Sequence, residues 1–210
     1  DVIGESFQSF LGPGMRGEKG QFFTPRNVVK MCVDILLPKD GELIIDPACG
    51  SGGFLVECIN KLKNKDSYEN IFGIDKEADL AKICKTYMAL VGDGHSNIYC
   101  ADSLDTSVWP DDMKNKVKNN LFDVVLTNPP FGSKIAVEDK KTLSKYVLAH
   151  IWDQKDNTFQ CLKELSNQAP QVLFIERCLQ LLKGGGRLAI VLPDGIFGNP
   201  SDKYIIHYLL

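Results

Sequence analysis

Short apolar runs alternate along this chain with segments of helical spacing. The runs have the length of buried strands and lie at 43–46, 71–75, 97–100, 122–126 and 187–192. Segments in which apolar residues recur every three or four positions lie at 28–36, 54–62, 80–88 and 172–182. This alternation predicts an α/β fold, with a mostly parallel sheet and helices on both faces.

Helix ends can be predicted from capping residues. Thr24 followed by Pro25 is typical of an N-cap and the first turn behind it, and Ser201 has the same place before the last helix. Gly184 to Gly186 are expected to close the helix over 172–182.

Polar side chains stand where the predicted strands end. Asp46, Asp75, Asp102 and Asn128 each end or closely follow an apolar run, at intervals of 29, 27 and 26 residues. Each interval is about the length of one strand–helix–strand unit. The four side chains are therefore expected at the carboxyl edge of one sheet, where doubly wound folds bind ligands.

The loop after the first strand, 46–53, is rich in small residues. Small residues let a ligand approach the backbone, and the N–H groups that open the next helix would face it. The loop lacks the Gly-Lys-Ser/Thr end of a phosphate loop and the G-x-G-x-x-G pattern of a dinucleotide site. A tight turn without a ligand is the alternative.

Two acids favour a nucleoside cofactor at this loop. Asp75 ends the next strand, as a carboxylate that accepts ribose hydroxyls would, and Asp102 could accept from an adenine amino group. A helix-capping role for Asp75 is the alternative.

The run Thr127-Asn128-Pro129-Pro130-Phe131 leaves the fourth predicted strand. Consecutive prolines stiffen the backbone and leave carbonyls without a local N–H partner. The Asn128 oxygen and the Pro129 carbonyl could then accept from one NH₂ group, and Phe131 offers a face on which a base could stack. An Asn-Pro turn with a core phenylalanine is the alternative.

Composition and net charge further limit the classes of protein to which this chain can belong. A chain of 210 residues suits one domain, and no apolar run approaches the roughly 20 residues that span a membrane. Seven scattered cysteines without a C-x-x-C pattern indicate reduced, buried thiols of a cytosolic protein, and three isolated histidines argue against a metal site. The net charge of −3 is unlike that of a free-standing nucleic-acid binder.

Four segments together resemble one family. GQFFTPR at 20–26, DPACGSGGFL at 46–55, NPPFG at 128–132 and GGRLAIVLPDG at 185–195 closely resemble the modification (M) subunit of type I restriction–modification systems, a family of N6-adenine DNA methylases. The resemblance covers nearly the whole chain, and the first segment is its most specific part.

The resemblance implies a Rossmann-like, S-adenosylmethionine-dependent methyltransferase fold and a role for each matching residue. The cofactor's methionine end would be lined by Gln21, Phe22, Phe23, Thr24, Pro25 and Arg26. The loop below the cofactor would comprise Asp46, Ala48, Gly50, Ser51, Gly52 and Gly53. The ribose would be held by Asp75, and the adenine ring by Asp102 with Ser103. The target adenine would be held by Asn128, Pro129, Pro130 and Phe131.

The family also implies partners. DNA would be bound through a complex with a specificity (S) subunit, a restriction (R) subunit and a second copy of the M subunit, in the cytoplasm of a prokaryote. Transfer of a methyl group to a protein glutamine or to an RNA exocyclic amine is the alternative activity, although those enzymes more often carry Tyr where Phe131 stands. A scaffold without catalysis is a further alternative.

The chain is expected to be one catalytic core, truncated at both ends, in four parts. Residues 1–37 form a leading helical segment, and 43–132 form the cofactor and target-base half. Residues 133–169 form a variable insertion, expected to be surface filler rather than a lid or DNA-facing loop, and 170–210 form a later helix–strand–helix unit.

Overall fold

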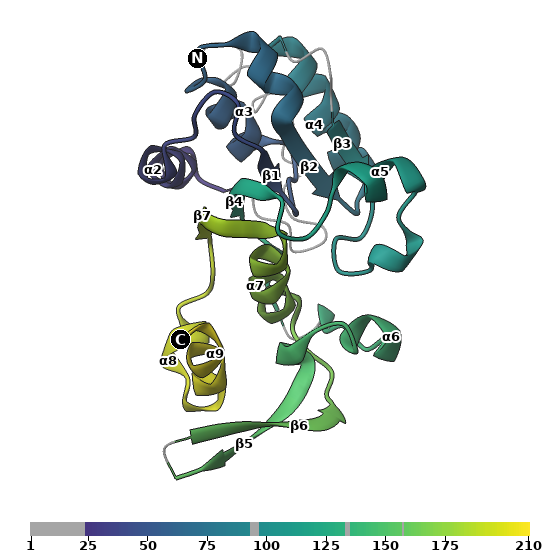
Figure 1. Cartoon of the computed structure of the whole chain (residues 1–210), viewed down its shortest axis with the longest axis vertical. Coiled ribbons are helices and arrows are strands. Elements are labelled where there is room, and N and C mark those ends of the chain that lie inside the picture. Colours follow the sequence, from purple (N-terminus) through teal and green to yellow (C-terminus); the bar gives the residue numbers. More distant parts are fainter. Residues whose placement is uncertain (1–23, 93–96, 133–134, 157) are drawn as a thin grey trace.

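A five-stranded parallel sheet is the centre of the molecule. The computed structural model describes residues 24–92, 97–132, 135–156 and 158–210. The strands stand in the order β3-β2-β1-β4-β7 and all neighbours are parallel, which confirms the predicted architecture (Figure 1). Their bounds are β1 Ile44–Asp46, β2 Ile71–Asp75, β3 Asn97–Cys100, β4 Phe122–Thr127 and β7 Leu182–Ile190.

Helices cover both faces of this sheet. The first face is packed by α2 (Arg26–Leu36), α3 (Gly53–Ile59) and α4 (Ala78–Leu90), in a core that includes Val33, Leu55 and Met88. The second face is packed by α5 (Asp111–Lys116) and α7 (Pro170–Leu181), whose Met113 and Cys178 are fully buried. Side chains alternate between the faces along β1, since Ile44 belongs to the first core and Ile45 to the second.

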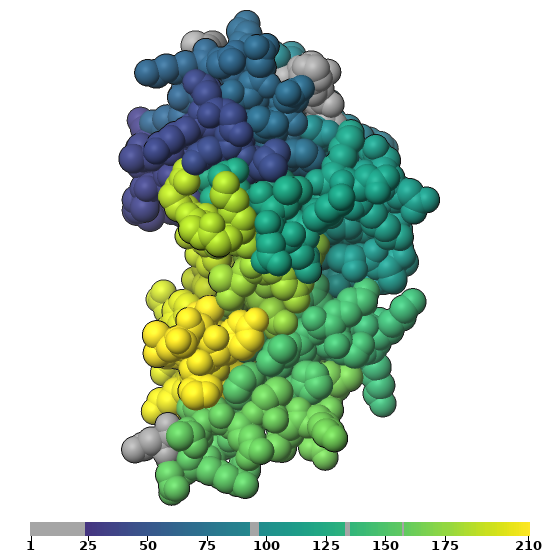
Figure 2. All heavy atoms as spheres, in the orientation of Figure 1, coloured from purple at the N-terminus to yellow at the C-terminus, as the bar shows by residue number. Residues whose placement is uncertain are grey.

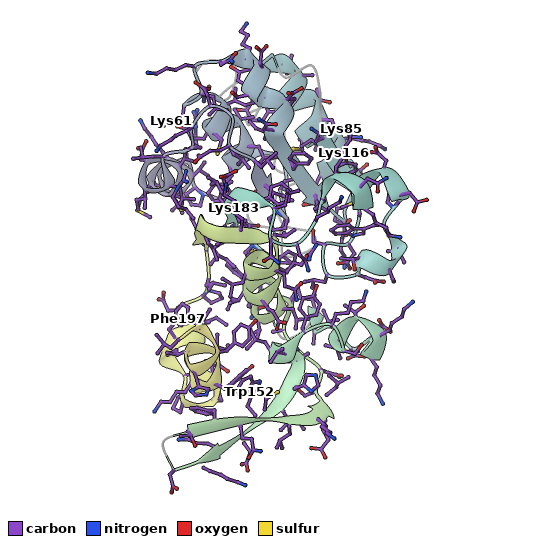
Figure 3. The ribbon with its side chains drawn as sticks, viewed as in Figure 1. Lys61, Lys85, Lys116, Trp152, Lys183 and Phe197 are labelled. Atoms are coloured by element: carbon purple, nitrogen blue, oxygen red, sulfur yellow. The ribbon has the colours of Figure 1, made fainter. Side chains whose placement is uncertain are left out.

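The last strand departs from its predicted bounds. β7 begins at Leu182, five residues before the predicted start, and the three glycines lie inside it rather than after a helix. Its second residue, Lys183, is labelled in Figure 3. The register between β4 and β7 shifts between Phe122 and Val124, because more residues of β7 than of β4 lie in this interval.

Residues 133–169 contribute to the core, so the expectation of surface filler is wrong. They form α6 (Lys140–Leu143) and a hairpin of β5 (His150–Lys155) with β6 (Thr158–Leu165). Leu143 and Tyr146 are buried against Phe174 of α7. The hairpin strands are mostly exposed and α6 is a single turn, so neither produces a regular pattern of apolar positions in the sequence. Figure 2 shows the strands β5 and β6 beside the C-terminal helices.

The C-terminal part is helical. It comprises α8 (Gly195–Gly198) and α9 (Lys203–Leu209), and Ile205 of α9 is fully buried. The residue before α9 is Asp202, and the predicted cap, Ser201, lies in a short 3₁₀ helix, so that prediction is wrong by one residue. The described 3₁₀ helices are Lys65–Asn70, Thr106–Val108, Val147–Ala149 and Pro200–Asp202.

Candidate functional site

A cavity of about 660 Å³ opens at the carboxyl edge of the sheet. Asp46, Asp75, Asp102 and Asn128 all line it, which confirms that these four strand ends meet at one place. Of the other predicted site residues, those that also line it are Thr24, Arg26, Ala48, Gly50, Ser51, Gly53, Ser103, Pro129, Pro130 and Phe131. Pro25 and Gly52 do not line it, and Gln21, Phe22 and Phe23 lie outside the described residues.

The glycine loop is a tight turn that forms the floor of the cavity. Gly50 and Gly52 have φ values of 52° and 90°, in the left-handed region that favours glycine. A Cβ on Gly52 would meet the Cys84 Sγ at 2.8 Å, whereas a Cβ on Gly50 would meet nothing within 4 Å. Gly52 is therefore required for packing against α4, and Gly50 leaves open space above the backbone.

Asp75 fastens this loop to the next strand. Its Oδ2 accepts from the Gly50 N–H at 2.8 Å, and its Oδ1 accepts from the Glu77 N–H at 2.9 Å, at the start of α4. Glu77 is itself the N-cap residue of α4 and no side chain caps this helix, so the capping alternative is wrong, and the Asp75 carboxyl group lines the cavity. Burial raises the pKa of Asp75, and the two N–H donors partly oppose that rise.

Asp46 is the most deeply buried acid of the site. Its side chain is 1% exposed, and its Oδ1 accepts from the Ala48 N–H at 3.0 Å. Burial raises the pKa of Asp46 to about 7, because the charged form loses its hydration. The Thr127 hydroxyl and the Ala48 N–H oppose this rise, and the nearby Asp75 adds to it.

The third acid lies on a loop held from two sides. Asp102 Oδ1 accepts from the Leu104 N–H at 2.9 Å, and its backbone carbonyl accepts from the Trp109 indole at 2.7 Å. The Ser103 hydroxyl donates to the Pro47 carbonyl and so joins this loop to the glycine loop. Ser103 therefore contributes its hydroxyl to the framework rather than to a ligand, although the residue lines the cavity.

The Asn128 amide has one satisfied end and one free end. Its Nδ2 donates to the Thr24 hydroxyl at 2.9 Å. Its Oδ1 is buried and has no hydrogen-bond partner among the described residues. A buried acceptor without a donor costs free energy, so such an atom in a cavity indicates a place for a ligand's N–H.

Three residues near Asn128 were not predicted from the sequence. The Gln171 side chain, at the start of α7, accepts from the Gly132 N–H at 3.2 Å and fixes the end of the Asn-Pro-Pro-Phe turn. Ile135 and Val137 line the same cavity as Phe131, which is 38% exposed. No sequence motif marks these residues. Ile135 and Val137 belong to a segment without clear periodicity, and Gln171 belongs to the largely buried helix α7.

The described residues offer no cluster of metal ligands. They contain no group of three or more His, Cys, Asp or Glu side chains that could hold an ion.

All seven cysteines are free; Cys49, Cys58, Cys84 and Cys178 are buried and Cys32 is half-buried. Cys100 and Cys161 are exposed, which differs from the expectation for these two. No helix among the described ranges is long and apolar enough to cross a membrane.

The fold and the site together define a class. The parallel strand order, the glycine loop after β1 and the carboxylates at the edge of the sheet are those of a Rossmann-like, S-adenosylmethionine-dependent methyltransferase fold. A model of the N-6 DNA Methylase family matches residues 1–210, and the chain belongs to this family.

Several proteins similar to this chain are methylase subunits of type I restriction enzymes. It is 31% identical over 206 residues to the EcoEI methylase subunit of a type I restriction enzyme from Escherichia coli, a match that covers 92% of this chain and 36% of that protein. It is 36% identical over 138 residues to the MjaIX type I methylase subunit of Methanocaldococcus jannaschii, over 63% of this chain and 23% of that protein. The chain thus spans well under half the length of these two relatives.

Solved structures agree on the fold. The methyltransferase subunit of a type I restriction–modification system from Streptococcus thermophilus has a TM-score of 0.70 and 21% identity, over 98% of this chain and 42% of that one. A chain in a structure of type I restriction–modification complex assembly has a TM-score of 0.71 and 27% identity, over 100% of this chain and 40% of that one.

Proposed function

We propose that this chain is the catalytic core of a DNA adenine-N6 methyltransferase, the modification subunit of a type I restriction–modification system. The observation that carries the proposal is the Asn128 amide oxygen, buried and without a donor in the cavity beside Phe131. An exocyclic NH₂ group of a base would supply the missing donor. The description of the matching family, N-6 DNA Methylase, supports adenine in DNA as that base, because N6 is the exocyclic amine of adenine.

The rest of the cavity suits S-adenosylmethionine. Bound there, this cofactor would supply a methyl group already activated on a sulfonium. Asp75 and Asp102 line the cavity with carboxyl groups that could accept from the hydroxyls and the amino group of such a molecule. The buried Asp46 also lines it, and Gly50 leaves room above the loop. A cavity of about 660 Å³ lies within the usual range for cofactor sites.

The chain's contribution to the reaction is positioning. The Asn128 oxygen would accept from the target amine, draw its geometry toward tetrahedral and so direct the nitrogen lone pair at the methyl donor. Phe131, half exposed at the cavity, would stack on the base after it leaves the duplex. No side-chain nucleophile would be required, because the amine nitrogen itself would bond to the methyl carbon as the carbon–sulfur bond breaks. The surplus proton on the nitrogen would then pass to solvent.

The proposed assembly supplies what the chain lacks. With a net charge of −3, the chain cannot neutralise many phosphates. We therefore assign sequence recognition to a specificity subunit that also holds a second copy of the modification subunit, with a restriction subunit in the complete complex. Such an enzyme acts where the chromosome lies, in the cytoplasm of a prokaryotic cell.

Replacing Asn128 with Ala tests the proposal. The variant removes one acceptor for the target amine and leaves the acids of the cavity in place. We expect a loss of about a hundredfold or more in methylation rate, because such a transition-state contact contributes on the order of 3 kcal/mol. S-Adenosylmethionine affinity, measured by calorimetry, should change little.

Asn97→Ala is the matched control. Asn97 lies at the start of β3, at the opposite edge of the sheet. Among the described residues its amide bonds to two exposed partners, the Glu69 carbonyl and the Lys116 ammonium group. Normal methylation by the Asn128→Ala variant, or equal loss of cofactor binding and rate, would show that Asn128 has another role. Label on RNA or protein, but not on DNA, would favour the alternative substrates.

A further inference from the structure

We propose that Thr24 is a positioning residue for the Asn128 amide, and that its hydroxyl joins the start of α2 to the target-amine loop. The inference rests on the proposed function. Thr24 and Asn128 are 104 positions apart in the sequence, and their side chains meet in a hydrogen bond of 2.9 Å at the wall of the cavity. The sequence indicates only a helix cap or a cofactor contact for this residue.

The cap reading is excluded by the geometry. Pro25 is the N-cap of α2, no side chain caps the helix, and the backbone carbonyl of Pro25 accepts from the Val28 and Val29 N–H groups. The Thr24 hydroxyl is directed instead at Asn128. It therefore contributes to the site rather than to the helix end.

The amide needs such a partner because its terminal torsion is soft. The χ2 angle of asparagine has a broad, roughly two-fold distribution, so packing alone fixes the amide plane poorly. A hydrogen bond at Nδ2 selects one orientation, and in that orientation Oδ1 stays in the cavity without a protein donor. The target amine would then meet an acceptor whose direction is set before it arrives.

The other end of the loop is fixed independently. Gln171 accepts from the Gly132 N–H at 3.2 Å, so the turn after Phe131 does not depend on Thr24. Loss of the Thr24 hydroxyl should therefore release the Asn128 side chain while the backbone of the loop remains in place.

Thr24→Val and Thr24→Ser separate this role from others. Valine keeps the shape and removes the hydroxyl, and serine keeps the hydroxyl. We expect Thr24→Val to lower kcat for methylation ten- to a hundredfold, with less than a threefold change in S-adenosylmethionine affinity by calorimetry. Thr24→Ser should recover most of the rate. Thr86→Val is the matched control, since Thr86 bonds to Lys82 within the exposed face of α4.

A double variant decides whether the effect passes through Asn128. If it does, Thr24→Val added to Asn128→Ala should lower kcat no further, whereas independent effects would multiply. In the protein without ligands, the ¹⁵N NMR signal of the Asn128 NH₂ group should shift in Thr24→Val and stay in place in Thr24→Ser. This second measurement requires no activity.

Four results would overturn the inference while leaving the proposed function intact. They are normal kcat in Thr24→Val, a larger effect on cofactor affinity than on kcat, multiplicative loss in the double variant, and an unchanged Asn128 signal. Absence of methylation by the unmodified protein with its partners would instead contradict the proposed function, and the NMR comparison would still test the hydrogen bond.

Discussion

Asp46 combines nearly complete burial with an ionisable group, and this combination makes the stability of the fold sensitive to pH. The pKa of Asp46 is about 7 in the folded chain and near 3.8 when the chain is unfolded. Between these two pH values, Asp46 is protonated in the folded chain and charged in the unfolded chain. The free energy of unfolding therefore falls as the pH rises from about 4 to 7, and the loss is complete above 7.

Asp46→Asn should remove this dependence. Relative to the unmodified chain, the variant should gain stability between pH 4 and 8, by a few kcal/mol and with about 4 kcal/mol as the upper bound. Urea unfolding at several pH values measures the difference. Asp105→Asn is the control: pairing with Lys145 lowers the pKa of Asp105 to about 2, so its effect should be constant above pH 5. If the free energies of unfolding of Asp46→Asn and of the unmodified chain change with pH in parallel, the Asp46 carboxyl group is charged in both the folded and the unfolded state over this pH range.

For single residues, the positions of the functional side chains were easier to predict from the sequence than their hydrogen-bond partners. The intervals between Asp46, Asp75, Asp102 and Asn128 placed them correctly at one edge, because each follows from the length of a strand–helix unit. Residue type alone could not show that Asp75 also holds the Gly50 N–H, or that Thr24 bonds to Asn128. Both contacts join segments whose packing depends on the whole fold.

Among the elements, the turn between β1 and α3 is tightly constrained. Gly52→Ala would place a methyl group in a left-handed conformation, 2.8 Å from the Sγ of the fully buried Cys84. We expect a loss of about 2–4 kcal/mol in the free energy of unfolding, from backbone strain and overpacking together. Chemical denaturation measures it.

Gly50→Ala is the matched control, because it shares the positive φ but meets open space. It should cost only about 1–2 kcal/mol. Adding Cys84→Ala to Gly52→Ala should return part of the lost stability, since the clash is with the sulfur. Equal costs for the two glycines, or a strictly additive double variant, would mean that the contact with α4 does not constrain the turn.

The elements were predictable to different degrees for a physical reason. Strands buried on both faces, such as β1 and β4, are continuous apolar runs bounded by polar turns, and their positions were correct. The hairpin of β5 and β6 was missed because its pattern of burial is irregular and most of its side chains are exposed. β7 was predicted too short because its first residues include three glycines, which usually end elements rather than begin them.

The charge of the whole molecule argues against independent DNA binding. A net charge of −3 gives little attraction to a phosphate backbone. We expect the chain without partners to bind duplex DNA weakly and without sequence preference, and the specificity subunit to confer both affinity and methylation. Gel shifts and methylation assays with and without that subunit measure this. Tight, sequence-specific binding by the chain alone would locate recognition within it.

The most direct test of the central claim is the identity of the methylated product. The intact methylase with its specificity subunit is incubated with unmethylated duplex DNA and S-adenosylmethionine labelled in its methyl group. The DNA is then digested to nucleosides and separated by liquid chromatography with mass spectrometry. From the proposed function we expect the label in N6-methyl-2′-deoxyadenosine, and we expect Asn128→Ala to abolish at least nine-tenths of it. Label in methylated cytosine, or none in DNA while RNA or protein is labelled, would contradict the account.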